Sequence, residues 1–232
     1  MIETINLVKS YRVGGQTLPA ADEVNLAVGK GEMVAVVGHS GSGKTTLLSL
    51  LGGLTRPDSG QVLIGGTAIW SLADNDLSEL RNRELGFIYQ FSSLIPTLTV
   101  QENVCLPSAF GLGLDDLLGR SLGLLEQVGL ADKAKFYPAQ LSGGQQRRVA
   151  IARAFINSPS IILADEPTGD LDEETEGDII RLFRQVNRES GTTFVIVTHN
   201  KTIASQAHRQ LVMKNGVLSA AAPAEKSQAE DS

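Results

Sequence analysis

A loop near the start of the chain has the residue types and the spacing needed to bind phosphate. It reads Gly38-His39-Ser40-Gly41-Ser42-Gly43-Lys44-Thr45, a full match to G-x-x-x-x-G-K-[ST]. Its glycines would let backbone N–H groups turn towards the β- and γ-phosphates of a nucleotide. Lys44 would add a positive charge and the Thr45 hydroxyl a ligand for Mg²⁺, while a helix beginning near Thr46 would add its positive N-terminal end. The loop therefore predicts nucleotide binding.

Two apolar runs later in the chain also end in residues that can do chemistry. Asp165 and Glu166 follow residues 161–164, and His199 comes shortly after residues 194–197. Because the carboxyl ends of parallel strands meet at one edge of a sheet, we expect these side chains beside the phosphate loop. There Asp165 would hold Mg²⁺ through water and Glu166 would orient or deprotonate an attacking water. His199 would donate a hydrogen bond to the γ-phosphate.

A second anion site is predicted at Leu141-Ser142-Gly143-Gly144-Gln145. Ser142 is a good helix N-cap, and the two glycines after it leave backbone N–H groups uncovered. This arrangement gives a helix N-terminus that can bind an anion without a lysine. Because one chain seldom needs two phosphate sites for one nucleotide, we expect this segment to serve a nucleotide held by a second copy of the chain. We call residues 141–145 the signature segment.

The elements that position these groups indicate an α/β protein. Residues 2–9 and 22–28 alternate apolar and polar side chains, as half-buried antiparallel strands do. The apolar run at 33–37, like those before Asp165 and His199, is typical of a strand buried on both faces of a parallel sheet.

The middle and the end of the chain have a different pattern. Helical spacing of apolar residues over 114–128 and 143–156 predicts a helical insertion between about 91 and 158. Residues 209–218, with the turn Asn215-Gly216, predict a hairpin. From Ala220 onward alanine, proline and charged residues dominate, so disorder is expected there.

Composition narrows the class of protein. The chain has 232 residues, of which 42% are hydrophobic and 20% are charged, and its net charge of −6 argues against a nucleic-acid partner. Cys105 is the single cysteine, so an intrachain disulfide is excluded and a reducing, cytoplasmic setting is expected. We expect no signal peptide at the N-terminus, and no apolar run approaches the length of about 18 residues that spans a membrane. A membrane part would therefore belong to another chain.

Together, the order and spacing of these motifs resemble the nucleotide-binding subunit of ATP-binding-cassette (ABC) transporters. The resemblance implies a P-loop NTPase fold: a RecA-like core, an antiparallel β subdomain and an inserted α-helical subdomain. It implies one domain over 1–219, with the core and β subdomain at 1–90 and 159–219, the helical subdomain at 91–158, and a disordered tail at 220–232.

The resemblance also implies roles for residues that the motifs alone do not assign. Tyr11 would stack on adenine, a contact worth roughly 1–3 kcal/mol. Gln90 would sense Mg²⁺ and the attacking water, so the implied metal site comprises Thr45, Gln90 and Asp165, with ATP and Mg²⁺ bound. The loop at 169–172 would cross the interface of a homodimer. Two positions depart from the usual family pattern: Asp170 replaces an asparagine, and Asn200 replaces an aspartate.

Residues 85–91 and 96–104, with Asp165-Glu166-Pro167-Thr168-Gly169, resemble the subgroup that serves lipoprotein release, macrolide efflux and cell division, and most closely the lipoprotein-releasing ATPases. This implies a subunit that hydrolyses ATP to power a separate integral membrane permease subunit, and that lies peripherally on the cytoplasmic face of the inner membrane. Residues 91–96 would transmit motion to that partner.

Two other functions would use the same two motifs. A regulatory module of a cell-division type complex would use the same ATP site without moving a substrate, and the sequence does not separate it from a transport subunit. A DNA-repair or chromosome-organising ATPase would need a long coiled coil between the phosphate loop and the signature segment, and no sustained heptad is present.

Overall fold

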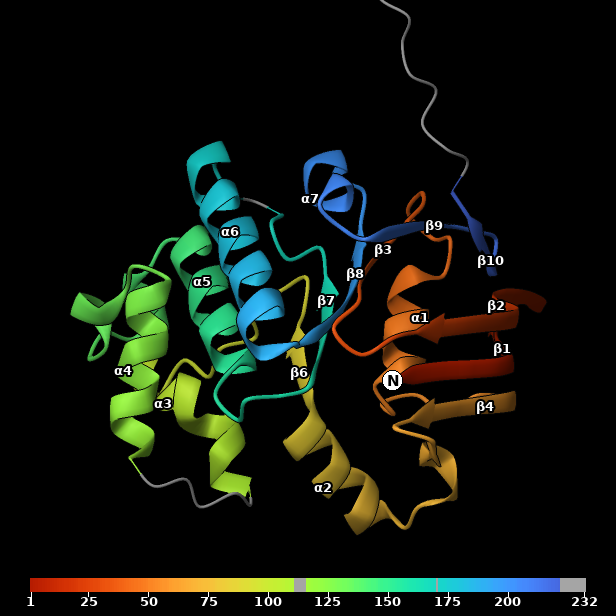
Figure 1. The fold of residues 1–232 in the computed structure, drawn as a ribbon, viewed down its shortest axis with the longest axis horizontal. Helices are drawn as coiled ribbons and strands as arrows, with labels where there is room; N and C mark the ends of the chain where they lie inside the picture. The colour runs from red at the N-terminus through yellow and green to blue at the C-terminus, as the bar shows by residue number, and fades with distance from the viewer. Residues whose placement is uncertain (111–115, 170, 222–232) are drawn as a thin grey trace, which may run out of the picture.

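A six-stranded sheet forms the centre of the computed structural model, which describes residues 1–110, 116–169 and 171–221 (Figure 1). The strand order is β10-β9-β3-β8-β7-β6. Strands β9, β3, β8, β7 and β6 are parallel, and β10 pairs antiparallel with β9. The bounds are β3 Met33–Val37, β6 Leu85–Ile88, β7 Ile161–Asp165, β8 Thr193–Thr198, β9 Arg209–Lys214 and β10 Val217–Ala220. The three predicted buried strands are confirmed, since β7 and β8 are buried throughout and β3 is buried except at its last residue.

The predicted hairpin forms the edge of this sheet. Asn215 and Gly216 have φ angles of 51° and 83°, the positive values that a tight hairpin turn requires at both central residues. Ala220 still pairs with Leu211, so the strand continues into the first residue of the predicted tail. Residues 222–232 of that tail lie outside the described residues.

A second sheet is antiparallel, with the order β2-β1-β4-β5. Its strands are β1 Ile2–Val13, β2 Gln16–Val28, β4 Ser59–Ile64 and β5 Thr67–Ala68. The predicted strands at 2–9 and 22–28 are confirmed, but both extend further, so that β1 and β2 form an arm whose turn follows Val13.

Helix α1 (Lys44–Leu51) lies between the two sheets and contacts β2, β7 and β8 (Figure 1). Its four leucines are nearly inaccessible and belong to the apolar core that also takes in the inner faces of β1 and β2. Burial of this helix fixes the phosphate loop directly before it, because the loop is held by β3 on one side and α1 on the other.

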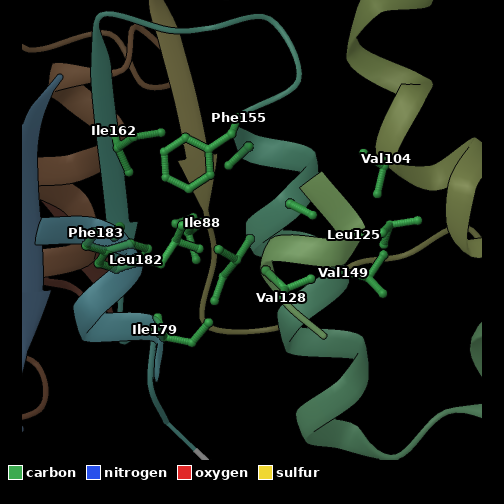
Figure 2. Packing of buried hydrophobic residues seen from close by; sticks show 14 of the residues in the cluster. Ile88, Val104, Leu125, Val128, Val149, Phe155, Ile162, Ile179, Leu182 and Phe183 are labelled. Atoms are coloured by element: carbon green, nitrogen blue, oxygen red, sulfur yellow. The ribbon is translucent and has the colours of Figure 1, made fainter. Parts of the chain in front are cut away.

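Whereas the helix at 74–84 buries Leu77 in the first core, the helices that follow residue 99 cover the other face of the parallel sheet and form a second core (Figure 2). Phe155, Phe183 and Phe194 pack together there, with ring centroids 5.2 to 6.4 Å apart. The bounds are α2 Asp74–Glu84, α3 Val100–Cys105, α4 Leu117–Gln127, α5 Gly143–Ala154, α6 Glu173–Ser190 and α7 Lys201–Ser205, with short 3₁₀ turns at Ile69–Ser71, Leu106–Phe110, Ala131–Lys133 and Pro138–Gln140.

The predicted helical insertion is therefore observed, and the described residues between 91 and 158 contain no strand. The helix predicted over 114–128 begins at Leu117, and residues 114 and 115 lie outside the described part. The exact subdomain boundaries remain a prediction. Across the described residues, no helix is both long and apolar enough to cross a membrane.

Candidate active site

A cavity of about 790 Å³ lies where β3, β7 and β8 end, beside the arm of β1 and β2. It brings together most of the residues that the sequence singled out. Those lining it are Tyr11, Gly38, His39, Ser40, Gly41, Gly43, Lys44, Thr45, Thr46, Gln90, Asp165, Glu166 and His199, together with Val13, Leu18, Pro19 and Ala20. Ser42 and the signature segment are the predicted binding residues that do not line it.

The conformation of the phosphate loop depends on two of its glycines. A Cβ atom at Gly38 would lie 2.2 Å from the carbonyl oxygen of Met213, and one at Gly43 would lie 2.1 Å from that of Ala20. Gly43 also has a φ of 106°, which side-chain-bearing residues rarely adopt. The loop is thus threaded between β9 and β2, and no larger residue fits at either position.

Lys44 folds back over its own loop. Its ammonium donates to the carbonyl oxygens of Gly38 at 2.7 Å and His39 at 3.0 Å. Because an ammonium group has three N–H donors, one remains for an anion in the cavity. The ammonium therefore lies where a phosphate bound by the loop would be.

Thr45 and Asp165 meet across the cavity floor, and the Thr45 hydroxyl donates to Asp165 Oδ2 at 2.8 Å. Burial raises the pKa of Asp165 above its ordinary value; the Thr45 hydrogen bond opposes this rise, and the carboxylate of Glu166 adds to it. A hydroxyl and a carboxylate are oxygen ligands of the kind that Mg²⁺ prefers. The described residues contain no cluster of three or more His, Cys, Asp or Glu side chains that could bind a metal. This donor pair fits an ion that keeps waters and takes further ligands from phosphate.

The raised pKa of Asp165 leads to a testable prediction. Because its pKa is raised in the folded state, the ionised carboxylate destabilises the fold at neutral pH. This penalty declines as the pH falls through the raised pKa and is gone below the ordinary pKa. Asp165→Asn should therefore raise the Tm of the nucleotide-free protein without Mg²⁺, because the amide carries no charge that burial penalises. Thermal unfolding at pH 7 measures this. An unchanged or lower Tm would contradict it.

Glu166 is held by two neighbours at the end of β8. Its Oε2 accepts from the Thr198 hydroxyl at 2.8 Å, and its Oε1 accepts from the backbone N–H of His199 at 3.0 Å. The His199 ring nitrogen Nδ1 lies 2.7 Å from the same Oε1, so Nδ1 carries the proton when Glu166 is ionised. Glu166 also has a φ of 45°, a strained value for this residue type. The structure thus fixes the carboxylate in one orientation.

Sequence reasoning did not assign the contact of Thr198 with Glu166, although Thr198 directly precedes His199 in the chain. The signal that could have indicated this contact is the place of Thr198 at the end of β8. Polar residues at the carboxyl ends of neighbouring parallel strands lie at the same edge of the sheet, and Asp165 and Glu166 lie at that edge. Asn200, one of the two departures from the family pattern, caps α7 and donates to Glu176 on α6 at 2.7 Å. An aspartate there could not donate this hydrogen bond. Asp170, the other departure, lies outside the described residues.

Tyr11 lies on the arm of β1 and β2, where it lines the cavity. It is 42% exposed, and the neighbouring Val13 and Leu18 are 59% and 49% exposed. The ammonium of Lys9 lies 5.8 Å from the centre of the Tyr11 ring. Open apolar side chains beside an aromatic ring form a surface on which a flat ring can stack.

The signature segment lies at the start of α5. Ser142 is the N-cap, as predicted: its hydroxyl accepts from the Gln145 N–H at 3.2 Å, and the Gln145 side chain accepts from the Ser142 N–H at 3.0 Å. The N–H groups of Gly143 and Gly144 come first in the helix and have no acceptor within it. Ser142 and Gly143 are exposed, so the start of this helix, the predicted anion site, is open to solvent.

Comparison with known proteins shows which family this chain resembles. A family profile described as "ABC transporter" matches residues 21–169. The lipoprotein-releasing system ATP-binding protein LolD of Shewanella oneidensis is 47% identical, over 90% of this chain and 92% of the relative. LolD of Alcanivorax borkumensis is 44% identical over 94% and 96%.

Two solved structures of ABC cassettes have a similar fold. A dimeric structure of the ATP-binding cassette MJ0796, in a post-hydrolysis state bound to ADP and Pi, has a TM-score of 0.90 and 39% identity, covering 96% of this chain and all of that one. A second dimeric structure of MJ0796, a bacterial ABC transporter cassette, has a TM-score of 0.89 and 42% identity over 93% and 95%.

The chain therefore belongs to the ABC transporter family. The predicted fold class and the predicted ATPase activity are confirmed by this membership, and the names of the relatives confirm the resemblance to the lipoprotein-releasing subgroup.

Proposed function

We propose that this chain is the ATPase subunit of a lipoprotein-releasing system and that it works as a homodimer on a membrane partner. The observation that carries this proposal is the separation of two predicted anion sites: the cavity holds the phosphate loop, Asp165 and Glu166, whereas the signature segment does not line it and begins with exposed residues. The names of its relatives and the dimeric structures of MJ0796 support it.

In this proposal the cavity binds ATP along its length. Tyr11 stacks on adenine at one end, and residues 38–46 hold the phosphates by backbone N–H groups and the Lys44 ammonium. Thr45, Asp165 and Gln90 hold Mg²⁺, directly or through water. When bound, the ion neutralises charge that develops on the phosphates.

Hydrolysis is assigned to Glu166 and its neighbours. Glu166, fixed by Thr198 and His199, orients a water and accepts its proton as the water attacks the γ-phosphorus. The bond from this phosphorus to the β–γ bridging oxygen breaks, and ADP and inorganic phosphate are released. His199 donates to the γ-phosphate from Nε2 when both ring nitrogens carry protons, and Gln90 would contact the water and the ion.

The second copy completes each site. The Ser142 hydroxyl and the free N–H groups of Gly143 and Gly144, with Gln145 beside them, bind the γ-phosphate of the nucleotide held in the partner's cavity. Two chains arranged head-to-tail thus share two nucleotides. Since ATP would bind this closed dimer more tightly than the open one, the difference in affinity drives closure, and hydrolysis removes it.

A groove beside β6, which shares no lining residue with the cavity, is the proposed docking site for the membrane subunit. It has a volume of about 430 Å³ and runs beside α2, β6 and the end of α5. Its lining is largely apolar and includes Leu54, Phe87, Tyr89 and Leu106. Ser93, three residues after Gln90, also lines it. A cytoplasmic segment of the permease seated here would hold the chain on the inner membrane and would respond to movement of residues 91–96.

This docking site can be tested with paired leucine variants. Leu54 is 44% exposed and lines the groove, whereas Leu118 is 64% exposed on α4 outside it. Leu54→Glu should weaken co-purification with the membrane subunit from detergent-solubilised native membranes by about tenfold or more. Its ATPase activity in isolation should stay within about twofold of the wild type.

Leu118→Glu is the control and should co-purify normally. The same capture tests the function itself, because the proposal requires an integral membrane subunit, with lipoprotein, to accompany the wild-type chain. Equal capture by both variants would contradict the docking site. Recovery of no membrane protein with the wild type would contradict the function.

A further inference from the structure

Arg147 is a buried arginine on the helix that begins with the signature segment. Its side chain lies in α5 at 5% exposure, although the ends of most arginines reach solvent. One guanidinium nitrogen, Nη1, donates to the carbonyl oxygen of Tyr89 at 2.8 Å and lies 3.4 Å from that of Glu166. A single side chain thus connects α5 to the ends of β6 and β7.

Both of these carbonyl groups belong to the proposed hydrolytic machinery. The carbonyl group of Tyr89 is part of the peptide bond to Gln90, so a contact that fixes this carbonyl also fixes the backbone at Gln90. The carbonyl group of Glu166 belongs to the strained residue whose side chain is the proposed base. Gly169 lies next to this contact, since a Cβ atom there would lie 3.4 Å from Glu166 O and 3.9 Å from Arg147 Nη2.

The same helix holds the far side of the Gln90 loop. Arg153, near the end of α5, donates to the carbonyl oxygens of Ser92 at 2.8 Å and Ser93 at 2.9 Å. Gln90 therefore lies between two arginine contacts from one rigid element. Of the two arginines, only Arg147 also reaches the loop after β7.

We propose that Arg147 is a positioning residue for ATP hydrolysis, which holds Gln90 and Glu166 in fixed geometry relative to the signature segment. This inference rests on the roles given above to Gln90, Glu166 and the dimer. In that dimer, the signature segment contacts the partner's nucleotide while Gln90 and Glu166 act on the chain's own. Arg147 then connects the two nucleotide sites through a helix of a few turns.

The physical reason is the strength and shape of the contact. Hydrogen bonds from a charged donor are about twice as strong as neutral ones, and a guanidinium group can hold two acceptors in one plane. If the group is removed, the carbonyl group of Tyr89 loses its charged partner and the Gln90 loop gains freedom. A small misplacement of catalytic groups reduces turnover far more than it reduces binding of substrate held elsewhere.

The test uses Arg147→Met, which keeps the length of the side chain without its donors, and Arg147→Lys, which can satisfy one carbonyl group. Arg120→Met is the matched control, because Arg120 also donates to backbone carbonyl groups, those of Phe155 and Ile156, away from the cavity. For Arg147→Met, kcat should fall by about tenfold to a hundredfold, with the KM for ATP within about twofold. Arg147→Lys should be intermediate, and Arg120→Met should keep its kcat.

A second readout does not depend on activity. Hydrogen–deuterium exchange of the nucleotide-free protein should increase at residues 89–93 in Arg147→Met and should stay unchanged there in Arg120→Met. A normal kcat in Arg147→Met would overturn the inference. So would equal losses of kcat in Arg147→Met and Arg120→Met, or exchange at 89–93 that does not change; if Arg147→Met fails to fold, Arg147→Lys decides on the same criteria.

The inference and the proposed function fail in different ways. If Glu166→Gln still hydrolyses ATP, the roles assigned to the machinery are wrong whatever Arg147 does. If Glu166→Gln is inactive and Arg147→Met turns over normally, the machinery stands and only the role of Arg147 is lost.

Discussion

Glu166→Gln is expected to abolish ATP hydrolysis while ATP remains bound. The glutamine keeps the shape of the side chain, and its oxygen can still accept from Thr198 or from the His199 N–H, so the loop after β7 should keep its conformation. It cannot accept a proton from the attacking water, and loss of general-base catalysis lowers kcat by about a hundredfold to ten-thousandfold. Steady-state phosphate release and the affinity for a fluorescent ATP analogue measure the two effects.

A matched substitution at the other end of the sheet provides the control. Glu84 is also partly buried and accepts from a hydroxyl, that of Ser160, but it lies before β6, away from the cavity. Glu84→Gln should leave kcat within about twofold of the wild type. Hydrolysis at the normal rate by Glu166→Gln would mean that another group accepts the proton.

Gly144→Asp is expected to stop hydrolysis without weakening the binding of ATP to a single chain. Gly144 lies outside the cavity, and a Cβ atom there would meet only a methyl group of Leu171, at 3.3 Å. The fold should therefore tolerate the side chain. In the proposed dimer, however, the new carboxylate would face the phosphates of the partner's nucleotide, and such like-charge contact costs several kcal/mol. A fall in kcat of at least about a hundredfold is expected.

Gly144→Asn separates charge from size, because asparagine has nearly the same shape and no charge. It should retain clearly more activity than Gly144→Asp, and both variants should bind ATP like the wild type when the protein is dilute. Two equal losses would attribute the effect to steric hindrance. An active Gly144→Asp would mean that the signature segment does not face a phosphate.

Much of the fold could be predicted because its strands and helices carry strong local patterns. Three apolar runs, each followed by glycine or by polar residues, indicated β3, β7 and β8, and the turn at Asn215-Gly216 indicated the hairpin. No expectation was made for α6, although its buried Ile179, Ile180 and Phe183 follow helical spacing. Helix α2 buries only Leu77, so its amphipathic signal is weak.

The site was predicted best where chemistry depends on contiguous residues. The phosphate loop and the strand-end residues Asp165, Glu166 and His199 meet in one cavity, as expected from their places on neighbouring strands. The contacts of Arg147 and Thr198 could not be predicted in the same way. Arg147 acts on backbone carbonyl groups far away in the sequence, and such partners leave no pattern of residue types.

The most direct test of the shared ATP site is the mass of Glu166→Gln in solution, measured by light scattering with and without ATP. We expect the mass of one chain without ATP and twice that mass with ATP, since bound nucleotide joins each phosphate loop to the partner's signature segment. Adding Gly144→Asp to this variant should return the mass to that of one chain while ATP stays bound. A Glu166→Gln chain that binds ATP and remains monomeric, or a dimer that Gly144→Asp does not affect, would contradict the account.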